Sequence, residues 1–159
     1  MKKLVLSLTL ALTAVALGAA AVAAAPVPQE GPFEGLFFGA IEGDRGSDAP
    51  IALALNHRGK EVAGQVYLGE GLLVDGGRCG SAAVPAGVQF ARGRTLPGDP
   101  DHLLTEITFE VQGFEVRVDL EAEISPDGEL IEVDAQIDLP WLCGVDPSLS
   151  GNLERVDPS

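Results

Sequence analysis

The sequence is poor in the residues that most enzyme sites need. Its 159 residues include two histidines, two cysteines, one tryptophan and one tyrosine. It contains no G-x-S-x-G elbow, and the nearest candidate nucleophile, in Cys79-Gly80-Ser81, has no neighbouring base. The glycine-rich stretch 69–78 lacks the G-K-[ST] ending and the following helix of a phosphate loop. We therefore expect no cofactor and favour a protein that is not an enzyme.

Histidines offer little for metal binding either. His57 and His102 both fall where a turn meets a predicted strand. A histidine in such a place is usually a surface residue, and two ligands alone make a poor zinc site. We expect both side chains at the surface.

Basic residues are scarce as well. The chain has 10 Lys and Arg against 24 Asp and Glu, which gives a net charge of −14. Such a surface repels phosphate backbones and anionic lipid headgroups. We expect neither a nucleic-acid partner nor, once the leader is removed, a membrane partner. The acidic residues are expected on a solvated face that keeps the protein soluble.

The first residues have the pattern of a secretory signal peptide. Lys2 and Lys3 precede an apolar run over 4–17 and a small-residue tract that ends at Ala25. We place cleavage after Ala23, because Pro26 hinders cutting after Ala25. The stretch 4–25 is about as long as a membrane span, but nine of its 22 residues are weakly hydrophobic alanine, which argues against an anchor. Residues 1–23 are therefore expected to direct export to the periplasm or the extracellular space.

Cysteine is limited to Cys79 and Cys143, and both lie in the exported part. In an oxidising compartment a lone pair of cysteines is most simply a disulfide. The cysteines are 64 positions apart, for which the chain-entropy model gives at most about 4 kcal/mol of stabilisation. We predict a structural disulfide.

Beyond the leader the chain has a period of two. Residues 24–32 form a predicted Pro-rich linker, and 33–156 form one predicted domain. The clearest strand is 114–124, where apolar residues alternate with Glu, Arg and Asp before the Ser125-Pro126-Asp127-Gly128 turn. A tight turn at Gln112-Gly113 precedes it. The other predicted strands span 33–42, 51–56, 62–68, 72–74, 87–94, 103–111, 131–139 and 149–156.

These strands predict an all-β fold. About eight or nine consecutive strands with one apolar face bury that face by closing into a barrel or by stacking as two sheets. We favour a single antiparallel up-and-down β-barrel because the turns are short, and we keep a β-sandwich as the alternative. A membrane barrel is disfavoured, because it would crowd acidic side chains into its lumen and lacks aromatic girdles. Glycines inside strands indicate sharp bends, at Gly35, Gly39, Gly64 and Gly151.

Two short segments resemble a known family. Gly31-Pro32-Phe33-Glu34-Gly35 and Leu149-Ser150-Gly151-Asn152-Leu153 are similar to the opening and closing strands of lipocalin-like barrels. The tryptophan typical of a lipocalin first strand is absent. The resemblance implies a lipocalin-like architecture and no functional residues.

A barrel of eight strands is just wide enough to be filled by side chains or to hold one small molecule. The function that we expect is therefore a non-enzymatic binding module for a small apolar ligand or a protein partner. Space inside the barrel would be left by small inward residues, namely Gly35, Gly39, Gly64 and Ala135. It would be filled by phenylalanines, namely Phe37, Phe109 and Phe114.

Three alternatives stay open. Paired carboxylates at a barrel mouth would make a hydrolase or isomerase. Oxygen-rich loops at 44–48 and 98–101 would bind calcium, although neither has EF-hand spacing. A structural or interaction protein would expose an apolar patch. Its best candidate is a strand that is apolar on both faces, with Phe33 and Phe37 on one and Leu36 and Phe38 on the other.

Overall fold

The computed structural model describes the backbone of residues 30–111 and 114–156. Side chains are described over the same ranges except at 109–111 and 114. The signal peptide 1–23, residues 24–29 of the linker and the Gln112-Gly113 turn lie outside the described residues, as do the side chains of Phe109 and Phe114. No helix of the described chain is long and apolar enough to cross a membrane.

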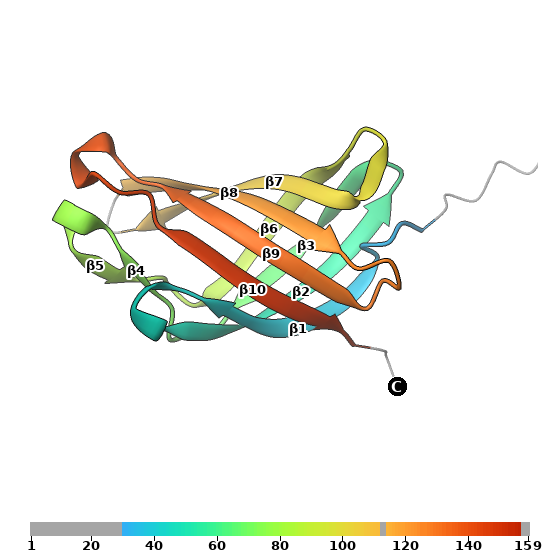
Figure 1. Ribbon diagram of the computed structural model, residues 1–159, viewed down its shortest axis with the longest axis horizontal. Coiled ribbons are helices and arrows are strands. Elements are labelled where there is room, and N and C mark those ends of the chain that lie inside the picture. Colours follow the sequence, from blue (N-terminus) through green and yellow to red (C-terminus); the bar gives the residue numbers. More distant parts are fainter. Residues whose placement is uncertain (1–29, 112–113, 157–159) are drawn as a thin grey trace, which may run out of the picture.

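Eight antiparallel strands close into a barrel with neighbours in the order β1-β10-β9-β8-β7-β6-β3-β2 (Figure 1). A separate two-stranded sheet of β4 and β5 lies at one end. The up-and-down barrel is therefore confirmed, and the sandwich is not. The strands are β1 (Gly35–Glu42), β2 (Asp48–Arg58), β3 (Glu61–Leu68), β4 (Leu73–Asp75), β5 (Ser81–Ala83), β6 (Gly87–Leu96), β7 (Asp99–Val111), β8 (Phe114–Ile124), β9 (Leu130–Asp138) and β10 (Ser148–Arg155).

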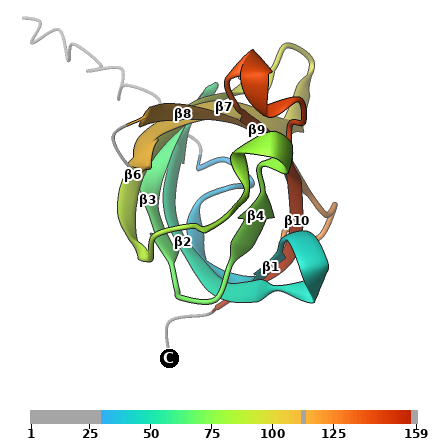
Figure 2. The same ribbon diagram turned by 90° about the vertical axis from the view of Figure 1, so that its left-hand side faces the viewer.

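The two ends of the barrel differ. One end carries the segment 69–86 between β3 and β6, which contains β4 and β5 and which we call the flap (Figure 2). The same end carries three short 3-10 turns, η1 (Asp44–Gly46), η2 (Gly77–Cys79) and η3 (Trp141–Cys143). The opposite end has only short turns and the incoming segment 30–34. We call these the flap end and the closed end.

The alternation read from the sequence decides which way each side chain points. Along β9, Ile131, Val133, Ala135 and Ile137 are all buried, and the residues between them are exposed. Acidic side chains of the strands therefore lie on the outer wall. Apolar side chains from successive strands meet inside, as the pattern predicted.

Two glycines are required where strands approach closely. A Cβ atom at Gly39 would lie 2.0 Å from the carbonyl oxygen of Asn152, and one at Gly64 would lie 2.0 Å from that of Ala54. Both positions therefore serve the close approach of neighbouring strands. The expectation that they leave room for a ligand was wrong.

The closed end is packed with aromatic and aliphatic side chains. Phe33 and Phe37 are fully buried there. Their predicted place in an exposed interaction surface was therefore wrong, because the inward face of β1 joins the core. Leu36 and Phe38 point the other way and are 44% and 55% exposed on the outer wall.

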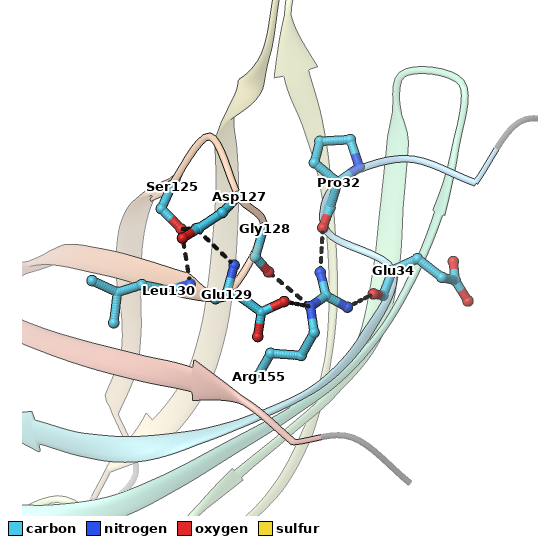
Figure 3. Close-up of polar contacts among 8 residues, drawn as sticks. All are labelled: Pro32, Glu34, Ser125, Asp127, Gly128, Glu129, Leu130 and Arg155. Atoms are coloured by element: carbon cyan, nitrogen blue, oxygen red, sulfur yellow. Dashed lines mark hydrogen bonds and ion pairs between the residues drawn. The ribbon is translucent and has the colours of Figure 1, made fainter.

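Arg155 fastens this end (Figure 3). Its guanidinium lies 4.6 Å over the Phe37 ring and donates hydrogen bonds to the carbonyl oxygens of Gly128, Pro32 and Glu34. One cation thus joins the end of β10, the β8–β9 turn and the segment that leads into β1. Hydrogen bonds from a charged donor to otherwise unpaired carbonyls are worth about twice a neutral pair.

His57 is part of the same closure, so its predicted surface position was wrong. It is 1% exposed. Its Nδ1 accepts a hydrogen bond from the Phe33 backbone N–H, and Nε2 lies 3.1 Å from the Gly59 carbonyl oxygen. Backbone groups thus contact both ring nitrogens, which is a structural role. His102 lies on the outer wall beside Glu121, as expected for a surface residue.

The barrel has one weak seam. Ladder pairs between β6 and β7 run only from Gly93 with Thr105 to Leu96 with Asp99. In Figure 1 the two strands leave a common turn and diverge toward the flap end. Over the described residues, 87–92 of β6 therefore have a ladder partner in β3 but none in β7.

We predict that Arg155→Gln lowers the free energy of unfolding by about 2 kcal/mol, because three partly buried carbonyls lose a charged donor. Arg92→Gln is the matched control, since Arg92 is exposed on the outer wall. Urea titrations of both variants measure the difference. Equal midpoints for the two variants would contradict the role given to Arg155.

Candidate functional site

The half of the barrel near the flap is hollow. An inner cavity of about 440 Å³ lies beneath the flap. Several side chains that point into it stay only partly buried, because no atoms fill the space beside them; they include Val66, Leu68 and Leu120. The further residues that line it are Ile41, Ile51, Leu72, Val84, Pro85, Ala86, Gly87, Gln89, Ile107, Val118, Ala135, Ile137 and Leu149.

A second hollow adjoins the first at the mouth. This mouth cavity of about 310 Å³ lies between the flap and the ends of β8 and β9. Val84 and Ile137 line both cavities, so the two spaces share a wall. The further residues of the mouth cavity are Val74, Gly76, Cys79, Gly80, Ala82, Ala83, Val116, Leu139, Pro140, Leu142 and Cys143.

The closed half leaves almost no space. The hollow among its core side chains, which include Phe33, Leu55 and Val62, holds about 30 Å³. Phenylalanine side chains thus help to fill the closed half of the barrel, as the sequence suggested for Phe37. In the other half Ala135 leaves room, since it lines the inner cavity.

The walls of both cavities are apolar. Among the residues that line them none is Asp, Glu, His, Lys or Arg, and Gln89 in the inner cavity is the one amide side chain. No Asp or Glu of the described chain is buried. A carboxylate mechanism needs a pocket acid whose pKa is raised by burial, so the exposure of the described acids leaves the hydrolase alternative without support.

The loops proposed for calcium are occupied by local contacts. Asp44 accepts a hydrogen bond from the Asp75 backbone N–H, and residues 98–101 span the end of the β6–β7 turn and the start of β7. Among the described residues, no group of three or more His, Cys, Asp or Glu is placed to hold a metal ion. A larger and more open hollow of about 860 Å³ lies over the outer wall of β6 to β10, and its lining includes the exposed acids Glu106, Asp119 and Glu121.

The flap is held over the mouth by a covalent bond and by polar contacts. The predicted disulfide between Cys79 and Cys143 is confirmed and joins η2 in the flap to η3 in the β9–β10 loop. Asp75 accepts hydrogen bonds from the Gly77 backbone N–H and from Arg45. The backbone N–H of Gly77 first, and Arg45 second, hold the pKa of the Asp75 carboxyl below its usual range.

The sequence predicted part of this site. It placed Ala135 inside, paired the cysteines correctly and predicted a strand at 72–74, one residue from the observed β4. It missed β5 (Ser81–Ala83) and the role of the whole segment as a cover over the mouth. The glycines of 69–78 indicate an irregular backbone in this segment, but the sequence pattern does not indicate where the segment lies relative to the barrel.

Of the comparisons with known proteins, only the one with solved structures finds matches, and these concern the fold. No protein-family model and no curated protein matches this chain. The solved structure of the redesigned β-barrel mFAP1 bound to DFHBI matches 78% of this chain and 95% of that chain, with 10% identity and a TM-score of 0.53. EF1p2_mFAP2b bound to DFHBI matches 79% of this chain and 94% of that chain, with 13% identity and a TM-score of 0.52. At these identities the likeness shows a closed β-barrel.

We predict that removing the disulfide with the paired substitutions Cys79→Ala and Cys143→Ala lowers the free energy of unfolding by up to about 4 kcal/mol. The barrel strands should remain, because none of their ladders depends on the bond. Urea titration and circular dichroism measure the two effects. A reductant should destabilise the wild type and leave the paired variant unchanged; a wild type indifferent to reductant would contradict the bond's role.

Proposed function

We propose that this protein is an exported binding module for a small, uncharged, apolar ligand, which it holds in the two cavities beneath the flap. The observation that carries the proposal is the apolar hollow confined to one half of a barrel whose other half is densely packed. Burying apolar ligand surface there is worth about 25 cal/mol per Å². Each cavity falls in the size range of small-molecule sites, which is roughly 300–1,000 Å³.

The expectation of an uncharged ligand follows from the residues that line the two cavities. A carboxylate placed in either cavity would meet no basic side chain among the lining residues. Burying a charge without a partner costs several kcal/mol or more. The acidic outer wall would also repel an anionic ligand as it approaches. Gln89 gives the inner cavity one hydrogen-bonding group, which suits a single hydroxyl or carbonyl on an otherwise apolar molecule.

Two further facts support the proposal. Designed barrels of similar shape are described as bound to the small molecule DFHBI, so this architecture is compatible with a small-molecule site. The disulfide and the predicted leader 1–23 both fit export to an oxidising compartment, periplasmic or extracellular.

We predict that the neutral dye N-phenyl-1-naphthylamine becomes fluorescent on binding the wild-type protein. Ala135→Phe should weaken its apparent affinity about tenfold or more, because a ring would occupy the inner cavity. Ala52→Phe adds the same ring to the outer side of β2 and should leave the affinity within about twofold. Fluorescence titration, with circular dichroism to check folding, makes the measurement. A wild type that leaves the dye dark would overturn the function.

We also predict a preference set by charge. A long-chain alkanol should displace the dye at concentrations at least about tenfold lower than the fatty acid of equal chain length, because only the acid carries a charge into the cavity. Competition titrations at neutral pH compare the two. If the fatty acid displaced the dye more strongly, the ligand class would be anionic and the argument from the walls would fail.

A further inference from the structure

The loop 139–147 between β9 and β10 places large apolar side chains in water. Trp141 is 91% exposed, Leu142 is 55% exposed and Val145 is 45% exposed. Trp141 is the chain's one tryptophan. A tryptophan left almost wholly in solvent lacks the burial that usually accompanies this side chain.

The exposure is built into the local structure. Cys143 is 2% exposed and its disulfide to Cys79 anchors η3, while Trp141 and Leu142 precede it in the same turn. Gly77 of η2 packs directly beneath, since a Cβ atom there would lie 2.8 Å from a Val145 methyl and 2.8 Å from the Cys143 carbonyl oxygen. The loop is thus held from below with its apolar tip outward.

The exposed tip is continuous with the mouth cavity. Leu142 lines that cavity and is also half exposed, and Leu139 and Pro140 line it from the same loop. An apolar surface therefore runs from the tip of the loop into the barrel. Figure 1 shows the loop at the flap end, beside β4 and β5.

The shape and charge of the tip favour a lipid surface over a protein. A stable protein interface needs about 800 Å² on each partner, which a three-residue turn cannot supply. Tryptophan and leucine on a projecting turn suit the boundary between headgroups and acyl chains. The loop 139–147 carries one charge, Asp146, and no basic residue, so it has nothing with which to bind anionic headgroups.

We propose that loop 139–147 inserts Trp141 and Leu142 into the surface of an uncharged, zwitterionic bilayer, so that the mouth cavity opens directly onto the acyl region. The identity of the ligand in the mouth cavity rests on the proposed function, whereas docking of the loop does not. This proposal departs from the expectation of no membrane partner, which rested on repulsion between the acidic surface and anionic lipid headgroups. A zwitterionic surface carries no net charge to repel the protein.

Trp141 itself reports on the docking. Adding phosphatidylcholine vesicles to the wild-type protein should shift its emission to shorter wavelength, and acyl chains brominated near the headgroup should quench it. Replacing a third of the lipid with phosphatidylglycerol should weaken binding, and added salt should restore part of it. An unchanged emission in phosphatidylcholine would overturn the proposal.

Matched leucines provide the control. Leu142→Asp should weaken vesicle binding about tenfold or more, because a carboxylate would enter the apolar boundary. Leu36→Asp places the same change on the outer wall of β1 and should bind vesicles like the wild type. Equal loss in both variants, or loss in neither, would contradict a role for the loop.

Three outcomes separate this proposal from its rivals. A tryptophan emission that is already blue-shifted without vesicles, and that depends on protein concentration, would mean that a second copy covers Trp141. Binding of N-phenyl-1-naphthylamine without any response to vesicles would overturn docking and leave the proposed function standing. A vesicle response without dye binding would do the reverse.

Discussion

Closure of the barrel is the constraint on which everything else depends. Each strand carries one apolar and one polar face, and a sheet of such strands shields the apolar face only if something covers it. Here the sheet covers itself. Strands β1 and β10, which begin and end the barrel chain, pair along Phe37 to Glu42, and this pairing leaves the acids outside in water. The enclosed space is therefore apolar before any particular function is considered.

The two ends of the barrel differ in how side chains fill the enclosed space. At the closed end Phe33, Phe37 and His57 fill it, and Arg155 joins three chain segments over it through hydrogen bonds to backbone carbonyls. At the flap end smaller side chains such as Val66 and Ala135 leave it open. A packed half stabilises the fold, and this leaves the other half free to hold a ligand at some cost in packing.

The flap end also combines features that have separate physical origins. The disulfide anchors η2 and η3, the polar contacts of Asp75 position the flap, and the exposed apolar tip at Trp141 borders the mouth cavity. The seam between β6 and β7 lies on the same half, and Gln89 and Ile107 line the inner cavity where the ladder is missing. The two proposals rest on these three features: the apolar hollow, the anchored cover and the apolar rim.

The sequence alone determined the eight barrel strands and the direction of their side chains, because alternation with period two is a local signal. It favoured the barrel through its short turns, and it fixed the disulfide because two cysteines allow one pairing. The strand 114–124 was predicted with its observed bounds. The sequence could not say that His57 would be buried, that Phe33 and Phe37 would be core rather than surface, or that Gly39 and Gly64 serve strand contact. The tertiary structure decided these points and the place of the cavity, because whether an inward side chain fills a space depends on neighbours that are distant in the chain.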